Sequence, residues 1–201
     1  MSRLSEIIDA ATGESVSVPS LLRMMQVLGA RTETVALIDW VDNELKGYRD
    51  GVVVPDYRGP FQVQVLTEWS GPFQSIVRNL PLPPSSVPQG LRDVGAFEVE
   101  LCEPVSELER LAESKSTLSY AWGADVVATL NGMMHRGEIE AILPMHGIVS
   151  AHRQISPAAI RSVLDNVRTR VLAVALEIER LLPNAGEPAS YLTVLCRFNT
   201  W

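Results

Sequence analysis

A long run of apolar residues at helical spacing, from Ser156 to Leu182, constrains the fold more than any other feature of the sequence. Ser156 can cap the first turn, Pro157 takes the favoured first helical position, and Pro183 and Gly186 follow the end. The apolar side chains recur every three or four positions, at Ile160, Val163, Leu164, Val167, Val171, Val174, Ile178 and Leu181. At about 1.5 Å per residue the helix spans roughly 40 Å. We expect it to carry the core, with intermolecular helix pairing as the alternative.

Three further helices are expected in the first 47 residues, separated by short turns. Ser17 is a suitable cap for the second helix, with Pro19 tolerated in its first turn. Thr32 is expected to cap the third helix, and Gly47 to end it. The apolar positions at helical spacing are Leu4, Ile7, Ile8 and Ala11 in the first helix, Leu21, Leu22, Met25 and Leu28 in the second, and Val35, Leu37, Ile38, Val41 and Leu45 in the third.

The segment from Tyr48 to Leu91 is rich in proline and glycine, which indicates a change from helix to extended chain. Residues 61–66 alternate between apolar and polar like a half-buried strand, and residues 96–101 predict a second strand. Residues 80–84 must be extended, because proline restricts the residue before it. We expect a small, mostly antiparallel sheet. The lack of regular strand–helix alternation disfavours a doubly wound nucleotide-binding fold.

The second half of the chain adds short elements before the long helix. Residues 105–112 and 125–134 predict helices, and residues 138–143 and 147–150 predict short strands. With the N-terminal helices and the long C-terminal helix, these elements predict an α+β fold that is predominantly helical.

A Pro/Gly linker at 184–190 divides the chain into a domain at 1–183 and a short, strand-like tail at 191–201. The tail is apolar and rich in strand-forming residues. An undocked strand exposes an edge, and such edges pair with other chains. We therefore expect the tail to support self-association or the binding of another protein.

Charge and cysteine content narrow the possible functions. The formal net charge is −7, the pI is near 5.0 and the seventeen basic residues are scattered, which disfavours non-specific phosphate binding. A local basic face would be compatible with this sequence, so nucleic-acid binding stays open. Cys102 and Cys196 lack the spacing of a zinc site or a disulfide framework. The sequence shows neither a secretory signal nor an apolar run of about 20 residues, so we expect a cytoplasmic protein that does not engage a membrane.

The histidines and serines form no recognisable catalytic motif. His135, His146 and His152 fall in one stretch, but their spacing and the lack of a carboxylate-rich partner motif disfavour a metal site. A GxSxG serine elbow and a Gly-rich phosphate loop are both missing. Because no plausible nucleophile is identifiable beside a histidine, we predict no catalytic residue, no metal and no cofactor.

Asp39, Asp42 and Glu44 crowd one predicted helix. Asp39 and Asp42 are three residues apart and could share a face, as a metal-dependent nuclease requires. Solvated carboxylates on a helix face are far commoner than such sites, and we prefer that interpretation.

The arginines of the long helix offer a different chemistry. Arg161 and Arg168 lie seven residues apart on one side of the helix, where they could bind phosphate or an acidic partner. Salt bridges to Asp165 or Glu177 are the structural alternative. Arg168 and Arg170 are not followed by a histidine at the RxxxxH spacing of helical ribonucleases.

The segments Trp40–Tyr48 and Pro55–Arg58 form the most distinctive local pattern. A helix ends at Gly47, aromatic residues flank its terminus, and a proline turn delivers an arginine. The candidate binding or structural-motif residues are Trp40, Glu44, Tyr48, Tyr57 and Arg58. In the structural interpretation the aromatic rings pack the helix terminus, while Arg58 pairs with Glu44.

An ordered set of segments resembles the AbiTii domain of bacterial abortive-infection and conflict systems. These segments are residues 4–12, the start of the second helix, 40–48, 55–58, 70–73, 78–83 and 167–179, and the likeness covers about residues 3 to 186. Family members often continue with Phe-Asn-Thr and an apolar, Gly-rich segment that looks suited to self-association. Phe198-Asn199-Thr200 resembles the start of that segment, but the chain stops at Trp201.

The resemblance implies a role in antiphage defence and brings no established catalytic mechanism. Our leading hypothesis is a non-enzymatic interaction or regulatory module that forms a homo-oligomer or binds another defence-system protein, through residues 191–201. The alternative is a toxic effector enzyme that acts on nucleic acid through charged residues, namely Asp39, Asp42, Glu44, Arg58 and Arg168. A sensor pocket for a phage protein or a small ligand is a third hypothesis.

Overall fold

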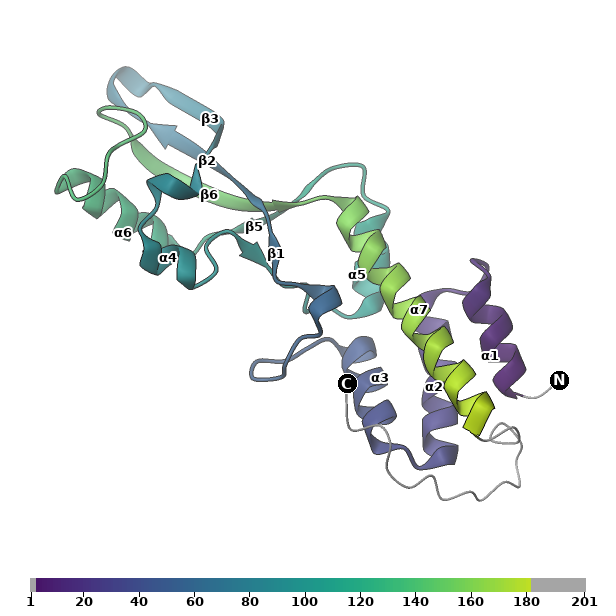
Figure 1. The fold of residues 1–201 in the computed structure, drawn as a ribbon. Helices are drawn as coiled ribbons and strands as arrows, with labels where there is room; N and C mark the ends of the chain where they lie inside the picture. The colour runs from purple at the N-terminus through teal and green to yellow at the C-terminus, as the bar shows by residue number, and fades with distance from the viewer. Residues whose placement is uncertain (1–2, 182–201) are drawn as a thin grey trace. The chain divides into compact units, whose positions relative to one another are not determined.

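A computed structural model describes residues 3–181, which divide into two compact units (Figure 1). Of the described residues, unit 1 comprises those up to Tyr57, the segment Cys102–Glu113 and those from Ala158 to Leu181. Unit 2 comprises Arg58–Leu101 and Ser114–Pro157. Each unit has its own hydrophobic core. The predicted linker and tail lie outside the described residues.

Unit 1 is helical. Its helices are α1 (Arg3–Thr12), α2 (Val18–Thr32), α3 (Val35–Lys46), α5 (Val105–Ala112) and α7 (Pro157–Leu181), whose first residue belongs to unit 2. Ser17 caps α2 as predicted, because its hydroxyl oxygen accepts the amide hydrogen of Ser20 at 3.4 Å. The amide of Val18, the first residue of α2, donates to the Glu109 carboxylate of α5 at 2.8 Å. Both observations explain why α2 begins where it does.

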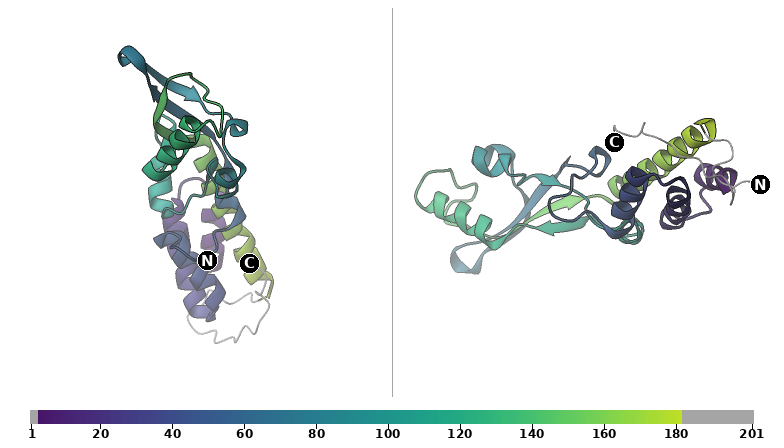
Figure 2. Two further views of the ribbon diagram at one scale, coloured as in Figure 1. Left: turned by 90° about the vertical axis from the view of Figure 1, so that its left-hand side faces the viewer. Right: turned by 90° about the horizontal axis from the view of Figure 1, so that it is seen from below.

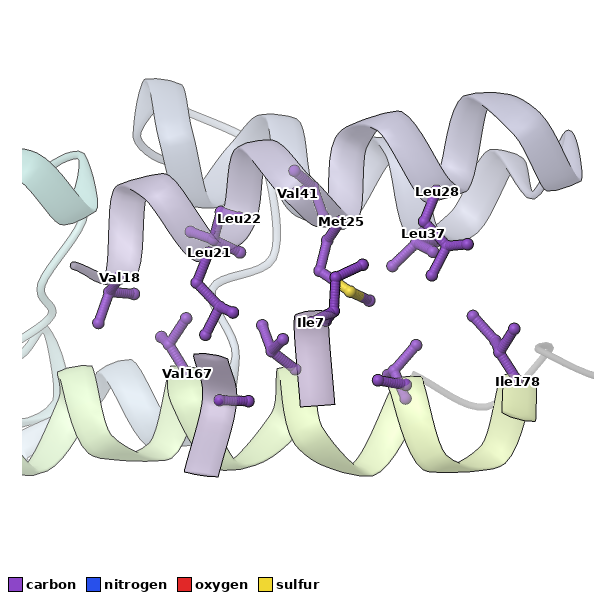
Figure 3. Close-up of a cluster of buried hydrophobic side chains, with 14 of the residues drawn as sticks. Ile7, Val18, Leu21, Leu22, Met25, Leu28, Leu37, Val41, Val167 and Ile178 are labelled. Atoms are coloured by element: carbon purple, nitrogen blue, oxygen red, sulfur yellow. The ribbon is translucent and has the colours of Figure 1, made fainter. Parts of the chain in front are cut away.

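The core of unit 1 lies between the apolar stripe of α7 and the N-terminal helices. Figure 3 shows Leu21 of α2 pointing toward Val167 of α7, while Ile178, farther along α7, points toward Leu28 and Leu37. The buried residues of α7 are Ile160, Val163, Val167, Val171, Val174, Ala175 and Ile178. This confirms the predicted stripe except at Leu164, which is partly buried, and at Leu181, which is exposed. Figure 2 shows α7 running alongside α1 and α2.

Unit 2 is built around antiparallel strands. The larger sheet has the order β3-β2-β6-β5, from β2 (Gln64–Ser70), β3 (Ile76–Pro81), β5 (Leu118–Ala121) and β6 (Gly147–Ile155). A two-stranded ribbon pairs β1 (Phe61–Gln62) with β4 (Glu98–Val99). The predicted small antiparallel sheet and the α+β class are therefore confirmed.

One face of the larger sheet is covered by helix and loop residues. Trp69 and Val65 of β2 pack with Ile148 of β6 and with Leu130 of α6 (Ala124–His135). Figure 1 shows α6 and the short helix α4 (Gln89–Asp93) beside the sheet. Buried indole nitrogens are satisfied, since Trp69 donates to the Thr67 hydroxyl at 2.7 Å and Trp122 to the Ala96 carbonyl at 2.9 Å.

Several local predictions are wrong. Thr32 does not cap α3: it is the last residue of α2, where its hydroxyl donates to the Leu28 carbonyl at 3.1 Å. Thr34 takes the cap position of α3, but its hydroxyl contacts Thr32 and does not cap an amide of the helix. Residues 138–143 lie in bends and irregular chain rather than a strand. The strand at 61–66 is interrupted at Val63, and the one at 96–101 shrinks to two residues.

Candidate functional site

The conspicuous aromatic and acidic residues gather at the C-terminal end of α3. Trp40 and Glu44 are four residues apart and therefore lie on one face of the helix. Gly47 ends the helix with a φ of 85°, and a Cβ at this position would lie 2.8 Å from the Cys102 carbonyl oxygen. Glycine is required here because the backbone passes so close to another segment. The amide of the next residue, Tyr48, donates to that same carbonyl at 2.8 Å.

Glu44 is fully buried and binds two tyrosines. Its Oε1 atom accepts hydrogen bonds from the hydroxyls of Tyr48, at 2.7 Å, and Tyr57, at 2.6 Å. The indole Nε1 of Trp40 donates to the Tyr57 hydroxyl at 2.8 Å. Together these residues form a connected network, which we call the Glu44 network, in which each of these donors meets an acceptor. Such satisfied buried networks rigidify a core.

The Glu44 network keeps its tyrosines neutral. Burial raises the pKa of Tyr48 well above its ordinary value, and the negative charge of Glu44 raises it further. The pKa of Tyr57 is also raised, first by burial and then by Glu44. The guanidinium carbon of Arg170 lies 4.5 Å from the centre of the Tyr57 ring, a cation–π distance. The tyrosines therefore act as hydrogen-bond donors and packing groups, as the structural interpretation of the motif requires.

The predicted site arginines bind backbone carbonyls. Arg168 donates to the carbonyls of Ala10, Gly13 and Val16, at 3.0, 2.7 and 2.6 Å, and so fixes the turn between α1 and α2 to α7. Arg161 donates to the Ala112 carbonyl at 2.7 Å. That carbonyl ends α5, where the helix dipole favours a positive charge. The expected partner Glu177 pairs instead with Arg180.

Arg58 is fully buried and belongs to unit 2. Its guanidinium donates to the Leu101 carbonyl at 2.6 Å, while its own carbonyl accepts the Leu101 amide hydrogen at 2.9 Å. Arg58 therefore links its own segment to that of Leu101 through both its side chain and its backbone carbonyl. The pairing of Arg58 with Glu44 stays a prediction.

The other acidic residues of α3 do not converge with Glu44. Asp42 binds Lys46 and also accepts from Gln26 at 2.9 Å. The hydrogen bond from Lys46 is the main reason that the pKa of Asp42 is lowered. Asp39 is exposed. Within residues 3–181 no three His, Cys, Asp or Glu side chains are grouped so that they could hold a metal ion.

One polar contact was missed by the sequence interpretation, which found no nucleophile beside a histidine. In unit 2, the Ser75 hydroxyl lies 2.9 Å from Nε2 of His146, and Nδ1 of the same ring lies 2.8 Å from the Pro144 carbonyl oxygen. These residues are 71 positions apart, and no motif links them. Only the pairing of β2 with β6, which sets Ser70 opposite Gly147, brings their loops together.

Comparison with known proteins gives one match. Searches of curated proteins and of solved structures found no match to this chain. Over the described part of the chain, no helix has the length and apolar character needed to cross a membrane. The AbiTii family profile matches residues 2–193, and this family suggests a role in abortive infection, a form of phage defence. The chain belongs to the AbiTii family.

Proposed function

We propose that the protein acts in antiphage defence as a non-enzymatic interaction or regulatory module that associates with itself or with another defence-system protein. The observation that carries this proposal is that the most conspicuous polar side chains make their hydrogen bonds inside the fold. Glu44 is buried among tyrosines, and Arg168 is bound to three carbonyls. Side chains in such positions stabilise the fold, so we look for the function in the contacts that the surface of the protein can make.

Exposed apolar side chains support an interaction role. In unit 1, Val35 is 69% exposed and Val53 is 89% exposed. In unit 2, Phe73 and Met145 are exposed by 103% and 82%. Large apolar groups of this kind contribute binding energy when a partner removes them from water. The apolar tail at 191–201 lies outside the described residues, and we propose it as a further contact.

The test is a phage challenge combined with a measurement of native mass. Cells that express the full chain are infected, and the purified protein is analysed by light scattering. We expect protection and a mass above that of one chain. A Leu192→Asp/Leu195→Asp variant should lose both, with an unchanged unfolding midpoint. A monomeric protein that protects cells and captures no defence-system protein from them would overturn the proposal.

A variant of Asp39 distinguishes this proposal from the alternative, an effector enzyme that acts on nucleic acid. Asp39 is the exposed residue among the charged residues that such an enzyme would use. An Asp39→Asn variant should fold normally and keep full protection if the protein is an interaction module. Glu44→Gln serves as the matched comparison, because it perturbs the buried network on the same helix. Loss of protection in a folded, self-associated Asp39→Asn protein, together with nuclease activity in the wild type, would favour the effector enzyme.

A further inference from the structure

Ser75 and His146 form a hydrogen-bonded pair whose direction is fixed by a third group. The Pro144 carbonyl oxygen, 2.8 Å from Nδ1, can only accept a hydrogen bond, so Nδ1 carries the ring proton of neutral His146. Nε2 then presents a lone pair toward the Ser75 hydroxyl at 2.9 Å. A nucleophile, a base within hydrogen-bond reach and a group that orients the base are the features of an activated serine.

The turn that carries Ser75 has an unusual backbone. Phe73 and Gln74 both have positive φ angles, 59° and 61°, although neither is glycine. The turn is closed by the Gly71 amide, which donates to the Ser75 carbonyl at 3.0 Å, and by the Ser75 amide, which donates to the Pro72 carbonyl at 3.1 Å. Residues held in left-handed conformations are concentrated at functional sites. The Ser75 hydroxyl is thus presented from a constrained turn.

Gly71 makes room for the histidine. A Cβ built on Gly71 would lie 2.4 Å from Cδ2 and 2.5 Å from Nε2 of His146. Any larger residue would therefore displace the ring from Ser75. The φ of Gly71 is −147°, so its backbone does not require glycine, and the close approach of the imidazole is the remaining reason for it.

A cavity of about 530 Å³ lies against the histidine. His146 and His135 form part of its wall, and Met134, Ala141 and Met145 supply apolar surface. The cavity therefore meets the Ser75–His146 pair on the histidine side. Asn131 also lines it, but its side chain is engaged with the backbone of Ile148 through two hydrogen bonds of 2.8 Å. Neither lysine nor arginine is among the lining residues, so a small apolar acyl group fits this cavity better than one that carries a carboxylate does.

We propose that Ser75 is an acyl-acceptor site, with His146 as its general base and carboxylic esters of small apolar acids as its substrate class. Oγ of Ser75 attacks the ester carbonyl while Nε2 of His146 takes the hydroxyl proton. The bond to the leaving oxygen then breaks, and His146 returns the proton to that oxygen. The products are acyl-Ser75 and an alcohol.

This inference goes beyond the proposed function and does not depend on it. A single acyl transfer marks the chain covalently and needs no turnover, so it is compatible with a regulatory module. Self-association is read from native mass, whereas acylation is read from the covalent mass of Ser75. The failure of either proposal is therefore visible separately.

The test uses p-nitrophenyl butanoate as the probe on the full chain. Release of nitrophenolate is followed in time, and acylated positions are mapped by mass spectrometry of peptides. We expect one butanoyl group per chain, on Ser75. Ser75→Ala should abolish this adduct, and His146→Gln should slow it by about a hundredfold, the lower end of what general-base catalysis supplies. Gly71→Ala should slow it as well, because it displaces the ring.

Matched controls come from the same unit. Ser86 is a partly buried serine whose hydroxyl donates to the Pro83 carbonyl at 2.7 Å, so Ser86→Ala should leave acylation unchanged. His152→Gln, on β6, should also have no effect. In the wild-type chain, the extent of acylation at Ser75 and at Ser86 is compared directly, without any substitution. Equal acylation of the two serines, or an unchanged rate in His146→Gln, would overturn the proposal. The Ser75–His146 hydrogen bond would then only connect two loops.

Discussion

Unit 1 turns its most distinctive polar side chains inward, whereas unit 2 leaves a hydrogen-bonded serine and histidine only partly buried at a turn. The Glu44 network of unit 1 has no exposed carboxylate, and its tyrosines are held neutral. In unit 2, His146 borders a cavity and Ser75 lies on a constrained turn. The difference teaches that a conspicuous motif can serve the architecture, while the more reactive arrangement lies where the sequence shows no motif.

The contrast between the two units predicts its largest effect on stability at Glu44. Glu44→Ala leaves two tyrosine hydroxyls without their acceptor. Each buried donor left unsatisfied costs about 1–3 kcal/mol, so the free energy of unfolding should fall by about 2–6 kcal/mol. Urea denaturation followed by tryptophan fluorescence measures this loss.

Two variants on the same helix complete that experiment. Glu44→Gln keeps one carbonyl oxygen as an acceptor and should lose less stability than Glu44→Ala. Asp39→Ala, at an exposed position, should hardly change it. If Glu44→Ala is as stable as Asp39→Ala, the Glu44 network does not support the fold and the structural interpretation of the motif is wrong.

The next effect concerns Arg168, which binds three carbonyls of the turn between α1 and α2. We expect Arg168→Ala to lower the free energy of unfolding by about 1.5–3 kcal/mol, the range for hydrogen bonds to a charged group. Arg168→Lys should recover only part of this, because an ammonium group lacks the planar fork of a guanidinium. Arg180→Ala, on the exposed end of α7, is the matched control and should have a smaller effect. Full recovery in the lysine variant would show that charge alone is needed.

The helices could be predicted from the sequence because their causes are local. In α2 and α7, apolar residues recur at the helical period, and a cap or a proline marks the start. The strands β3 and β5 were missed because they are edge strands, at the two ends of the order β3-β2-β6-β5. Pro81 is tolerated in β3 since an edge strand need not donate every amide. Their conformation depends on pairing with distant residues, which periodicity does not record.

The site residues divide in the same way. Trp40, Glu44 and Tyr48 were identifiable because they lie on or just after one helix, at spacings that bring them together. The sequence could not show that Tyr57 shares the same carboxylate oxygen, 13 residues away. Ser75 and His146 meet only through the register of β2 and β6. Long-range strand pairing therefore decides which polar groups unit 2 brings together.

A smaller effect is expected at alkaline pH, and it tests the neutral state of the tyrosines. The pKa values of Tyr48 and Tyr57 are raised in the folded chain, whereas an unfolded tyrosine has a pKa of about 10. Above that pH the unfolded chain releases protons that the folded chain retains. The stabilisation that comes from keeping both tyrosines protonated is therefore fully present below about pH 10. As the pH rises further, the free energy of unfolding decreases by about 1.4 kcal/mol per pH unit for each tyrosine.

Denaturation of the wild type and of Tyr48→Phe across this pH range measures the decrease. The phenylalanine variant removes one of the two titrating hydroxyls, so its stability should fall less steeply with pH than that of the wild type. Comparing the slopes rather than the absolute stabilities removes the contribution of the lost hydrogen bond. Parallel slopes would show that Tyr48 ionises as readily in the folded chain as in the unfolded chain.

The smallest effect on stability is expected at Ser75, where the contrast between the units becomes sharpest. Ser75→Ala removes one hydrogen bond of a partly buried hydroxyl, so the free energy of unfolding should fall by only about 0.5–1.5 kcal/mol. Glu44→Ala, measured in the same denaturation series, should lose several times more. If Ser75→Ala is as destabilising as Glu44→Ala, the Ser75–His146 pair is an architectural contact like the Glu44 network. A small loss of stability accompanied by complete loss of butanoylation would instead separate the two units by role, because the pair would then be needed for reactivity and hardly needed for folding.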